Sequence, residues 1–307
     1  MKKPVLIALL CLCASLVVMF FGFRGTPQSA PAKTHSITLL TQEDTGSFLL
    51  QLRYGAEAAC NGTGDKLSVL TLDPKDTAGQ IEELSKDDIS AILLYAGDDA
   101  LVSEVAQACD EENLPLVLLG RTAENVSCAA SDEIMAGRLA VQQARSLNAT
   151  RVICMTDNSD LTVSRMDGVM DEFASNPDNV LRWDGWQNAQ TMTEDVLRFA
   201  EQGAAVIALS EDATLAAVKM RSEGLLGSGT LIIAIEANPD QIDLLEKGVL
   251  SALILPAPYT ISYRGCGMAI AALNGSALKS VLIQPKQITL DNLYSAENVN
   301  ITFPLLQ

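Results

Sequence analysis

Short apolar runs recur along this chain every few tens of residues, and a stretch with helical spacing follows most of them. Unbroken apolar runs of this length are typical of parallel strands that are buried on both faces. Strands that alternate with helices predict βαβ units, because parallel neighbours need a crossover connection. The predicted strands are Ser36–Thr41, Leu67–Leu72, Ala91–Tyr95, Pro115–Leu119, Arg151–Met155, Ala204–Leu209, Thr230–Ile235 and Leu250–Leu255, with a weaker one at Val180–Trp183.

These strands are too many for a single small sheet, and 307 residues are enough for two hydrophobic cores. Between the strands, apolar side chains such as Met166, Val169, Met170 and Phe173 repeat at the spacing of one helical face. The pattern therefore predicts an α/β fold with two lobes, each a parallel sheet flanked by helices.

The first residues form a separate segment. Lys2 and Lys3 precede an apolar stretch from Pro4 to Phe23, and the next charge is Arg24. Such a stretch is long enough to span a bilayer, and the flanking charge places the rest of the chain outside. Residues 1–32 are thus predicted to be a signal or anchor segment with a spacer, either cleaved or retained. The chain is expected in the periplasm or on the outer face of the cytoplasmic membrane.

The net charge of −17 limits the partners of the exported part. Residues 1–32 contain Lys2, Lys3 and Arg24 and no acid, so the remainder is even more acidic. A surface of this charge repels the phosphates of nucleic acids, and no nucleic acid partner is expected.

Catalysis is not expected either. The only histidine is His35, so a histidine triad and a histidine metal site are both excluded. The chain has no phosphate-binding loop of the G-x-x-x-x-G-K-[ST] type. We expect no metal and no cofactor. An odd number of cysteines lies outside the leader, and the sequence assigns no disulfide among Cys60, Cys109, Cys128, Cys154 and Cys266.

The stretch from Leu114 to Arg138 has the pattern of a crossing between the lobes. The run Pro115–Leu119 ends at Gly120, and Arg121 follows directly. The chain then continues extended to Ala130 and enters a helix at Ser131-Asp132, where either side chain could cap the first turn. Ligands bind beyond the carboxyl ends of the strands in open α/β sheets, so Arg121 is a candidate ligand contact.

Several stretches, in this order and spacing, resemble the type I periplasmic solute-binding proteins of the ribose-binding branch. This family shares its ligand-binding fold with lactose-repressor-type regulators. The likeness covers about residues 36–294. It is carried by Phe48–Ala56 (FLLQLRYGA), Leu72–Asp76 (LDPKD) with Gln80-Ile81, Ala91–Asp99 (AILLYAGDD), Asn125–Asp132 with Gly137-Arg138, Arg165 with Asp167-Gly168, Leu209–Ala217, Ala234–Ala237 and Thr289–Leu293 (TLDNL).

The resemblance implies two lobes joined by three crossings that close on a ligand like a hinged trap. The crossings are expected near Ser131, Pro256–Pro258 and Gln284–Ile288. Lobe 1 would then comprise residues 33–131 plus 257–286, and lobe 2 residues 132–256 plus 287–307.

The resemblance also implies polar ligand contacts. Arg121 and Arg165 match donors of the family, and Glu236 lies where the family has a sugar-binding aspartate. Ser210 replaces an asparagine, so a hydroxyl takes the place of an amide. Gly120 and Pro256 replace two further ligand-binding residues and supply no polar side chain.

Aromatic and loop residues complete the predicted site. Phe48 keeps one ring of a paired aromatic position in the family. Trp186 follows the weak strand at Val180–Trp183, where an aromatic side chain often covers the ligand in the family. Glu43 and Asp44 lie on the loop after the first strand and are expected to face the ligand, although either could instead pair with Arg121.

These features predict an exported protein that captures a small polar ligand, expected to be a sugar, for an ABC-type importer with a membrane permease. The two arginines would also accept a carboxylated sugar. The alternative is a ligand-sensing partner of a membrane signalling protein, such as a sensor kinase or a chemoreceptor, with the same fold. The ligand, the oligomeric state and the choice between transport and sensing stay open.

Overall fold

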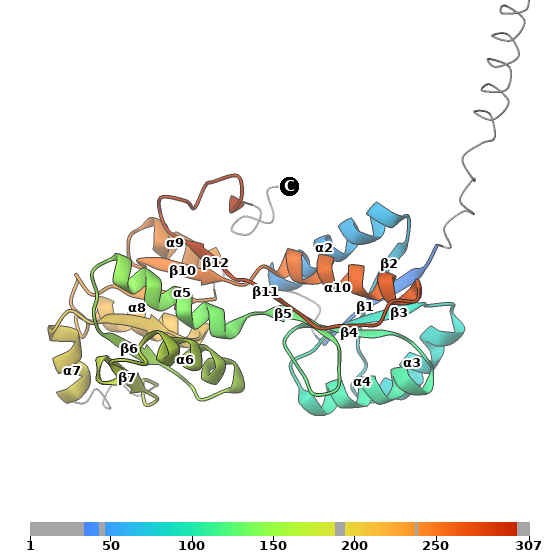
Figure 1. The fold of residues 1–307 in the computed structure, drawn as a ribbon, viewed down its shortest axis with the longest axis horizontal. Helices are drawn as coiled ribbons and strands as arrows, with labels where there is room; N and C mark the ends of the chain where they lie inside the picture. Colours follow the sequence, from blue (N-terminus) through green and yellow to red (C-terminus); the bar gives the residue numbers. More distant parts are fainter. Residues whose placement is uncertain (1–33, 43–46, 188–193, 237–238, 300–307) are drawn as a thin grey trace, which may run out of the picture. The chain divides into compact units, whose positions relative to one another are not determined.

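A computed structural model describes residues 34–42, 47–187, 194–236 and 239–299 of the chain. The described residues form two six-stranded sheets with helices on their faces (Figure 1). The predicted signal or anchor segment, residues 1–32, lies outside this part of the chain. Among the described helices, none is long and apolar enough to cross a bilayer.

The first sheet has the strand order β11-β5-β4-β3-β1-β2, and all its neighbouring strands are parallel. Helices α2 and α10 cover one face, and α3 and α4 cover the other (Figure 1). Its elements are β1 (Ser36–Thr41), α2 (Ser47–Thr63), β2 (Lys66–Thr71), α3 (Thr77–Lys86), β3 (Ala91–Tyr95), α4 (Asp99–Glu111), β4 (Leu116–Gly120), β5 (Cys128–Ser131), α10 (Pro258–Leu273) and β11 (Val281–Ile283).

The second sheet has the order β12-β10-β9-β8-β6-β7, and its strands are parallel except for the edge strand β12. Its elements are α5 (Glu133–Ser146), β6 (Val152–Met155), α6 (Asp160–Glu172), the 3₁₀ turn η1 (Pro177–Asn179), β7 (Val180–Trp183), α7 (Glu194–Glu201), β8 (Ala205–Ala208), α8 (Glu211–Ser222), β9 (Ile232–Ile235), α9 (Pro239–Glu246), β10 (Ala252–Leu255) and β12 (Lys286–Ile288).

Burial on both faces explains the unbroken apolar runs. In β3, successive residues alternate between two cores: Ile92 and Leu94 pack with α3 and α4, whereas Leu93 packs with α2 and α10. In β6, Ile153 and Cys154 divide between two cores in the same way. The predicted α/β class with two flanked parallel sheets is confirmed.

The two sheets share one strand order, which reverses between β1 and β3 and again between β6 and β8. Loops on either side of such a reversal diverge, and the space that they leave at the carboxyl ends of the strands is where α/β proteins bind ligands. The candidate ligand-binding residues are therefore those that follow β1, β3 and β4 in one sheet and β6, β8 and β9 in the other.

The ends of the nine predicted strands lie within two residues of the observed ends. Three short observed strands, β5, β11 and β12, were not among the predicted strands. β5 is part of the stretch predicted to be extended after Arg121. β11 and β12 have three residues each, and β12 is the polar sequence KQI at a sheet edge. Three residues are too few to establish a periodic pattern. Lys286, placed in lobe 1 from the sequence, belongs to the second sheet.

A buried carboxylate holds the start of β1. The backbone N–H of His35 donates to Asp65 Oδ1 at 2.7 Å, and the hydroxyl of Thr63 donates to Oδ2 at 2.6 Å. Burial raises the pKa of the Asp65 carboxyl, but these hydrogen bonds and the nearby His35 ring outweigh burial and hold the pKa below its ordinary value.

The substitution Asp65→Asn is expected to lower the free energy of unfolding by about 1.5 kcal/mol at pH 7, the scale of a hydrogen bond to a charged group. A carboxyl whose pKa is depressed by folding stabilises the protein above its unfolded pKa of about 3.9, and this contribution is lost as the pH falls through the folded pKa. Urea unfolding at pH 7 and pH 3 should show the gap to wild type narrowing in acid. A gap that is independent of pH would contradict the assignment, and the exposed Asp178→Asn provides the control.

Candidate functional site

A buried arginine lies at the carboxyl end of the second sheet. Arg165, in the second turn of α6, is 1% exposed, and three of its nitrogens donate hydrogen bonds. Nε donates to Glu133 Oε2 at 2.6 Å, Nη1 to the carbonyl oxygen of Leu209 at 2.6 Å, and Nη2 to Glu236 Oε1 at 2.7 Å. We call Glu133, Arg165, Leu209 and Glu236 the Arg165 cluster.

The cluster keeps its arginine charged and offers a carboxylate outward. Burial lowers the pKa of Arg165, but the charges of Glu236 and Glu133 outweigh it and raise the pKa. The Glu133 side chain is 15% exposed and the Glu236 side chain 33% exposed. With two carboxylates around one guanidinium, the cluster carries one net negative charge, and its most accessible group is an acceptor of hydrogen bonds.

The backbone of Glu236 is in an unusual conformation. Its φ of 77° lies in the left-handed region, which is costly for a residue with a side chain. The residue follows β9, and its N–H donates to the carbonyl of Ile254 at 2.9 Å. The strained turn and the ion pair with Arg165 together fix the carboxylate at the end of the strand, as a binding group requires.

The cluster lies at the reversal of strand order. Leu209 follows β8, and the loop after β6 is ordered by Asp157, which accepts hydrogen bonds from the Ser159 N–H at 3.0 Å and the Thr162 hydroxyl at 2.7 Å. Burial raises the pKa of Asp157, but these bonds outweigh it and lower the pKa. Ser210, a predicted ligand contact, caps α8 by accepting from the Ala213 N–H, and its hydroxyl proton can still be donated elsewhere.

At the carboxyl end of the first sheet, Arg121 follows β4. Its Nη1 donates to the carbonyl oxygen of Gly97, and its Nη2 pairs with Asp99 at the start of α4. Gln42, after β1, accepts from the Gly97 N–H through Oε1 at 3.0 Å. These contacts connect the ends of β1, β3 and β4, again at the reversal of strand order.

An aromatic pair lies beside this group. The rings of Phe48 and Tyr95 are stacked with centroids 5.4 Å apart, and both side chains are half-buried. A Cβ at Gly120 would lie 3.4 Å from the Tyr95 ring and 3.7 Å from the Phe48 ring. Gly120 also has a φ of 87°, which favours glycine. The family resemblance would place an aspartate at position 120. In this chain the position is a glycine, and the rings of Phe48 and Tyr95 lie next to it.

The structure brings Arg165 and Glu236 together at one sheet and places Phe48 near Arg121 at the other. Trp186 is different: its ring is 6% exposed within the core of the second lobe, and its Nε1 donates to the Thr156 carbonyl at 2.9 Å. A ring buried in this way has little surface for stacking on a ligand, so the structure does not support its predicted role. Glu43 and Asp44 lie outside the described residues.

Sequence reasoning missed Glu133, Tyr95 and Asp99. Glu133 is the first residue of α5 and follows the capping residue Asp132, which accepts from the Met135 N–H at 2.9 Å. An acidic residue in a first helical turn is common because of the helix dipole, so its sequence position did not indicate a partner for Arg165.

Other features of the surface do not contribute to this site. A hollow of about 390 Å³ lined by Arg145, Glu172 and Phe173 includes Ala149 and Thr150, which precede β6 and therefore lie at the opposite, amino edge of the sheet. Within the described ranges, no group of three or more His, Cys, Asp or Glu side chains is arranged to hold a metal ion.

A family model described as a periplasmic binding protein domain matches residues 37–277, which include both groups of site residues and the strands of both sheets from β1 to β10. The chain belongs to this family. Its members bind ligands rather than act as enzymes, and they work outside the cytoplasm. No curated protein sequence matches the chain.

Solved structures of this periplasmic-binding-protein family have the same fold. A mutant XylFII–LytSN complex matches with a TM-score of 0.69 and 18% identity over 85% of this chain and 99% of the other. GanP, a glucose-galactose binding protein from Geobacillus stearothermophilus, matches with a TM-score of 0.69 and 17% identity over 85% and 99%. A Caulobacter myo-inositol binding protein bound to myo-inositol matches with a TM-score of 0.65 and 19% identity over 90% and 99%.

Proposed function

We propose that the chain is an extracytoplasmic solute-binding protein that captures a small, neutral, hydroxyl-rich ligand between its two lobes and delivers it to an ABC-type importer. The ligand class is a sugar or a cyclitol. The observation that carries the proposal is the outward carboxylate of Glu236, held by a buried arginine at the end of β9.

A carboxylate suits hydroxyl groups because it accepts their hydrogen bonds and has four lone-pair sites. Three of the five N–H groups of Arg165 donate to Glu133, Leu209 and Glu236, and the side chain is 1% exposed. Arg165 therefore positions the carboxylate, and Glu236 is the more accessible group for a ligand. The cluster carries one net negative charge, and Arg121 is paired with Asp99. This balance disfavours a carboxylated sugar, which the two arginines alone would have favoured.

The first lobe supplies complementary groups in this proposal. Phe48 and Tyr95 present a stacked aromatic pair, and apolar faces of sugar rings pack on aromatic rings. Arg121 and Gln42 are the polar groups beside the pair. Two of the matched structures are described as a glucose-galactose binding protein and a myo-inositol binding protein, which is the same ligand chemistry.

A thermal-shift screen of residues 33–307 tests the proposal with neutral pentoses, neutral hexoses, cyclitols, amino sugars and sugar acids. A ligand at about a hundred times its dissociation constant stabilises a protein by roughly 2.7 kcal/mol. For a protein of this size, the expected rise in Tm is about 5–10 °C. We expect the rise with a neutral polyol. A rise with sugar acids alone would contradict the proposed ligand class, and no rise at all would contradict the capture of a polyol.

The variant Glu236→Gln tests whether the ligand that raises the Tm binds at the Glu236 carboxylate. Its amide oxygen still accepts from Arg165, but the negative charge is lost, so the dissociation constant should rise about 10- to 100-fold, the equivalent of roughly 1.5–3 kcal/mol for a charge-assisted hydrogen bond. The control is Glu223→Gln, which removes an exposed carboxylate on the same lobe and should leave affinity unchanged. Equal affinities in wild type and Glu236→Gln would remove Glu236 from the site.

A second candidate function is ligand sensing with a membrane signalling partner. It is favoured by one specific observation: a matched structure is a complex of two different proteins. Both functions share the binding step and differ in the protein that responds to it. Genes for a permease and an ATPase beside the gene of this chain would favour transport, and a histidine-kinase gene would favour sensing.

A further inference from the structure

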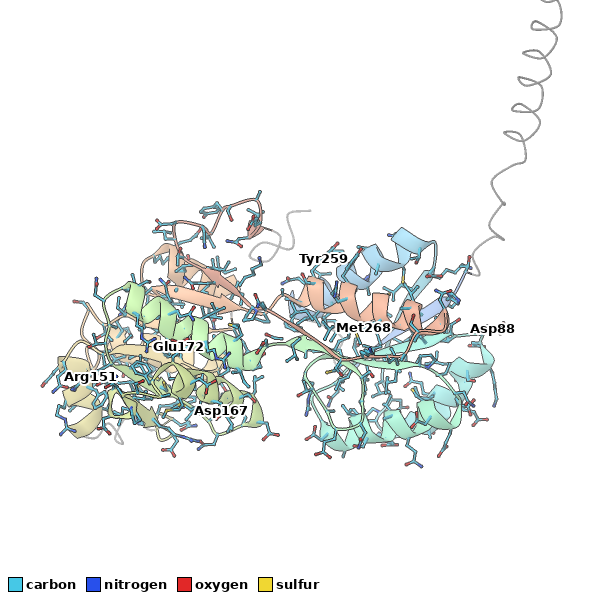
Figure 2. All side chains as sticks on the ribbon, in the orientation of Figure 1. Asp88, Arg151, Asp167, Glu172, Tyr259 and Met268 are labelled. Carbon is cyan, nitrogen blue, oxygen red and sulfur yellow. The ribbon has the colours of Figure 1, made fainter. Side chains whose placement is uncertain are left out.

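Two cysteines from distant parts of the sequence meet inside the first lobe. Cys60 lies near the end of α2, and Cys266 lies in the middle of α10, the helix on which Figure 2 labels Tyr259 and Met268. Both side chains are buried, and their sulfur atoms are 3.4 Å apart. The structure describes both as free thiols. A disulfide requires an S–S separation of about 2.05 Å, so a small adjustment of the two side chains would allow a bond.

Close packing of the two helices holds the thiols together. A Cβ at Gly55 of α2 would lie 2.1 Å from the Tyr259 carbonyl oxygen and 2.2 Å from Ser262 Oγ, so only glycine allows α10 to approach this closely. A Cβ at Gly265 would lie 2.4 Å from Leu119, so α10 is equally close to the sheet. Gly55 of α2 faces Tyr259 and Ser262 of α10, and Cys60 faces Cys266. Because the residue numbers rise together on both helices, α2 and α10 run in the same direction.

The two thiols differ from the other buried cysteines. The hydrogen bond from Cys266 lowers the pKa of Cys60 despite burial, whereas burial raises the pKa of Cys109 and Cys154 to about 12. In the folded lobe Cys60 is therefore the more readily ionised thiol of the pair.

We propose that Cys60 and Cys266 form a disulfide bond in the exported protein, made by exchange with an oxidised dithiol oxidoreductase outside the cytoplasm. The Cys60 thiolate attacks one sulfur of the oxidoreductase disulfide and releases the other as a thiolate. The Cys266 thiolate then attacks Cys60 Sγ and displaces the oxidoreductase. The two thiol protons pass to the departing dithiol, which carries away the two electrons. Both thiols are buried in the folded chain, so the exchange occurs before α10 packs on α2.

This bond would connect the two parts of the sequence that build the first lobe. Cys60 belongs to the segment before the first crossing, and Cys266 belongs to the segment that returns after the second. The bond closes a loop of 206 residues. A cross-link stabilises mainly by restricting the unfolded chain, and the effect grows with loop length. Disulfides persist in the oxidising compartments where this family works.

Peptide mass spectrometry of the full-length chain tests the proposal. The chain is produced in a bacterium with an intact thiol-oxidising export pathway, quenched with acid and alkylated without reductant. We expect a cross-linked peptide that contains Cys60 and Cys266 and disappears after reduction, while Cys109, Cys128 and Cys154 are alkylated directly. Free Cys60 and Cys266 thiols in the exported chain, or a cross-link between other cysteines, would overturn the proposal.

Refolding from urea gives a second measurement. The chain refolded with oxidised glutathione should unfold about 10 °C above the chain refolded with dithiothreitol, given the length of the closed loop. Cys266→Ala should abolish this redox difference. The control Cys154→Ala creates a cavity of similar size in a buried strand and should keep the difference, which separates loss of a bond from loss of packing. A redox difference that persists in Cys266→Ala would also overturn the proposal.

Discussion

Replacing Arg165 with methionine is expected to lower the free energy of unfolding of the second lobe by about 3–5 kcal/mol. Methionine fills a similar volume, but it leaves the carboxylates of Glu133 and Glu236 close together with no cation between them, and Glu133 is largely buried. Removing one member of a buried ion group carries a cost of this size because the remaining charges are uncompensated. The cost falls on the fold as well as on ligand binding, because Arg165 also satisfies the Leu209 carbonyl.

Urea unfolding of the second lobe measures the effect, with Arg138→Met as the matched control. Arg138 pairs with Asp171 at 2.6 Å between α5 and α6, but both side chains are exposed. Such surface pairs contribute about 0–1 kcal/mol. Neutralising both carboxylates in the Arg165→Met background, with Glu133→Gln and Glu236→Gln, should recover part of the loss. If the triple variant is no more stable than Arg165→Met, the loss comes from packing and not from unpaired charge.

The sequence was sufficient to predict which candidate residues lie at the carboxyl ends of strands. Ser210 and Glu236 each follow an apolar run directly, and Arg121 follows one after Gly120. The carboxyl ends of parallel strands meet at one edge of a sheet. The apolar runs were visible because both faces of each sheet are covered. The position of a residue along a strand thus follows from local pattern, whereas the ligand-binding roles of these three residues stay predictions.

The partners of those residues could not be predicted in the same way. Glu133 is 32 residues from Arg165, and Asp99 is 22 residues from Arg121. Both acids are in first helical turns, where their charge already has a local explanation. The burial of Trp186 depends on the core that it shares with Val196 and Phe199 of α7, which a single aromatic residue in a sequence does not indicate. In each case the missing information is tertiary packing, not residue type.

The approach of α5 to α6 decides whether Glu133 can reach Arg165, and it depends on two glycines. A Cβ at Gly137 would lie 1.9 Å from the Arg165 carbonyl oxygen, and a Cβ at Gly168 would lie 1.9 Å from the Ile134 carbonyl oxygen. These contacts involve backbone atoms, which cannot move aside as the end of a side chain can. The helices must separate if either glycine gains a side chain, and the separation would pull Glu133 away from Arg165.

Gly168→Ala is therefore expected to lower the free energy of unfolding by about 2–3 kcal/mol, the scale of overpacking in a core. This loss occurs although alanine favours a helix over glycine by roughly 0.5–1 kcal/mol. The control is Gly267→Ala on α10, where a new Cβ meets nothing within 4 Å. The same chemical change should stabilise the protein there by up to about 1 kcal/mol.

Urea unfolding and ligand titration of the two variants separate the roles of the glycine. Gly168→Ala should weaken binding of the polyol identified by the screen, because the Arg165 cluster that holds the Glu236 carboxylate loses the Glu133 contact. Gly267→Ala should bind as wild type does. If Gly168→Ala is destabilised but binds the polyol with unchanged affinity, Arg165 and Glu236 suffice to position the carboxylate, and the role of Glu133 is confined to neutralising a buried guanidinium.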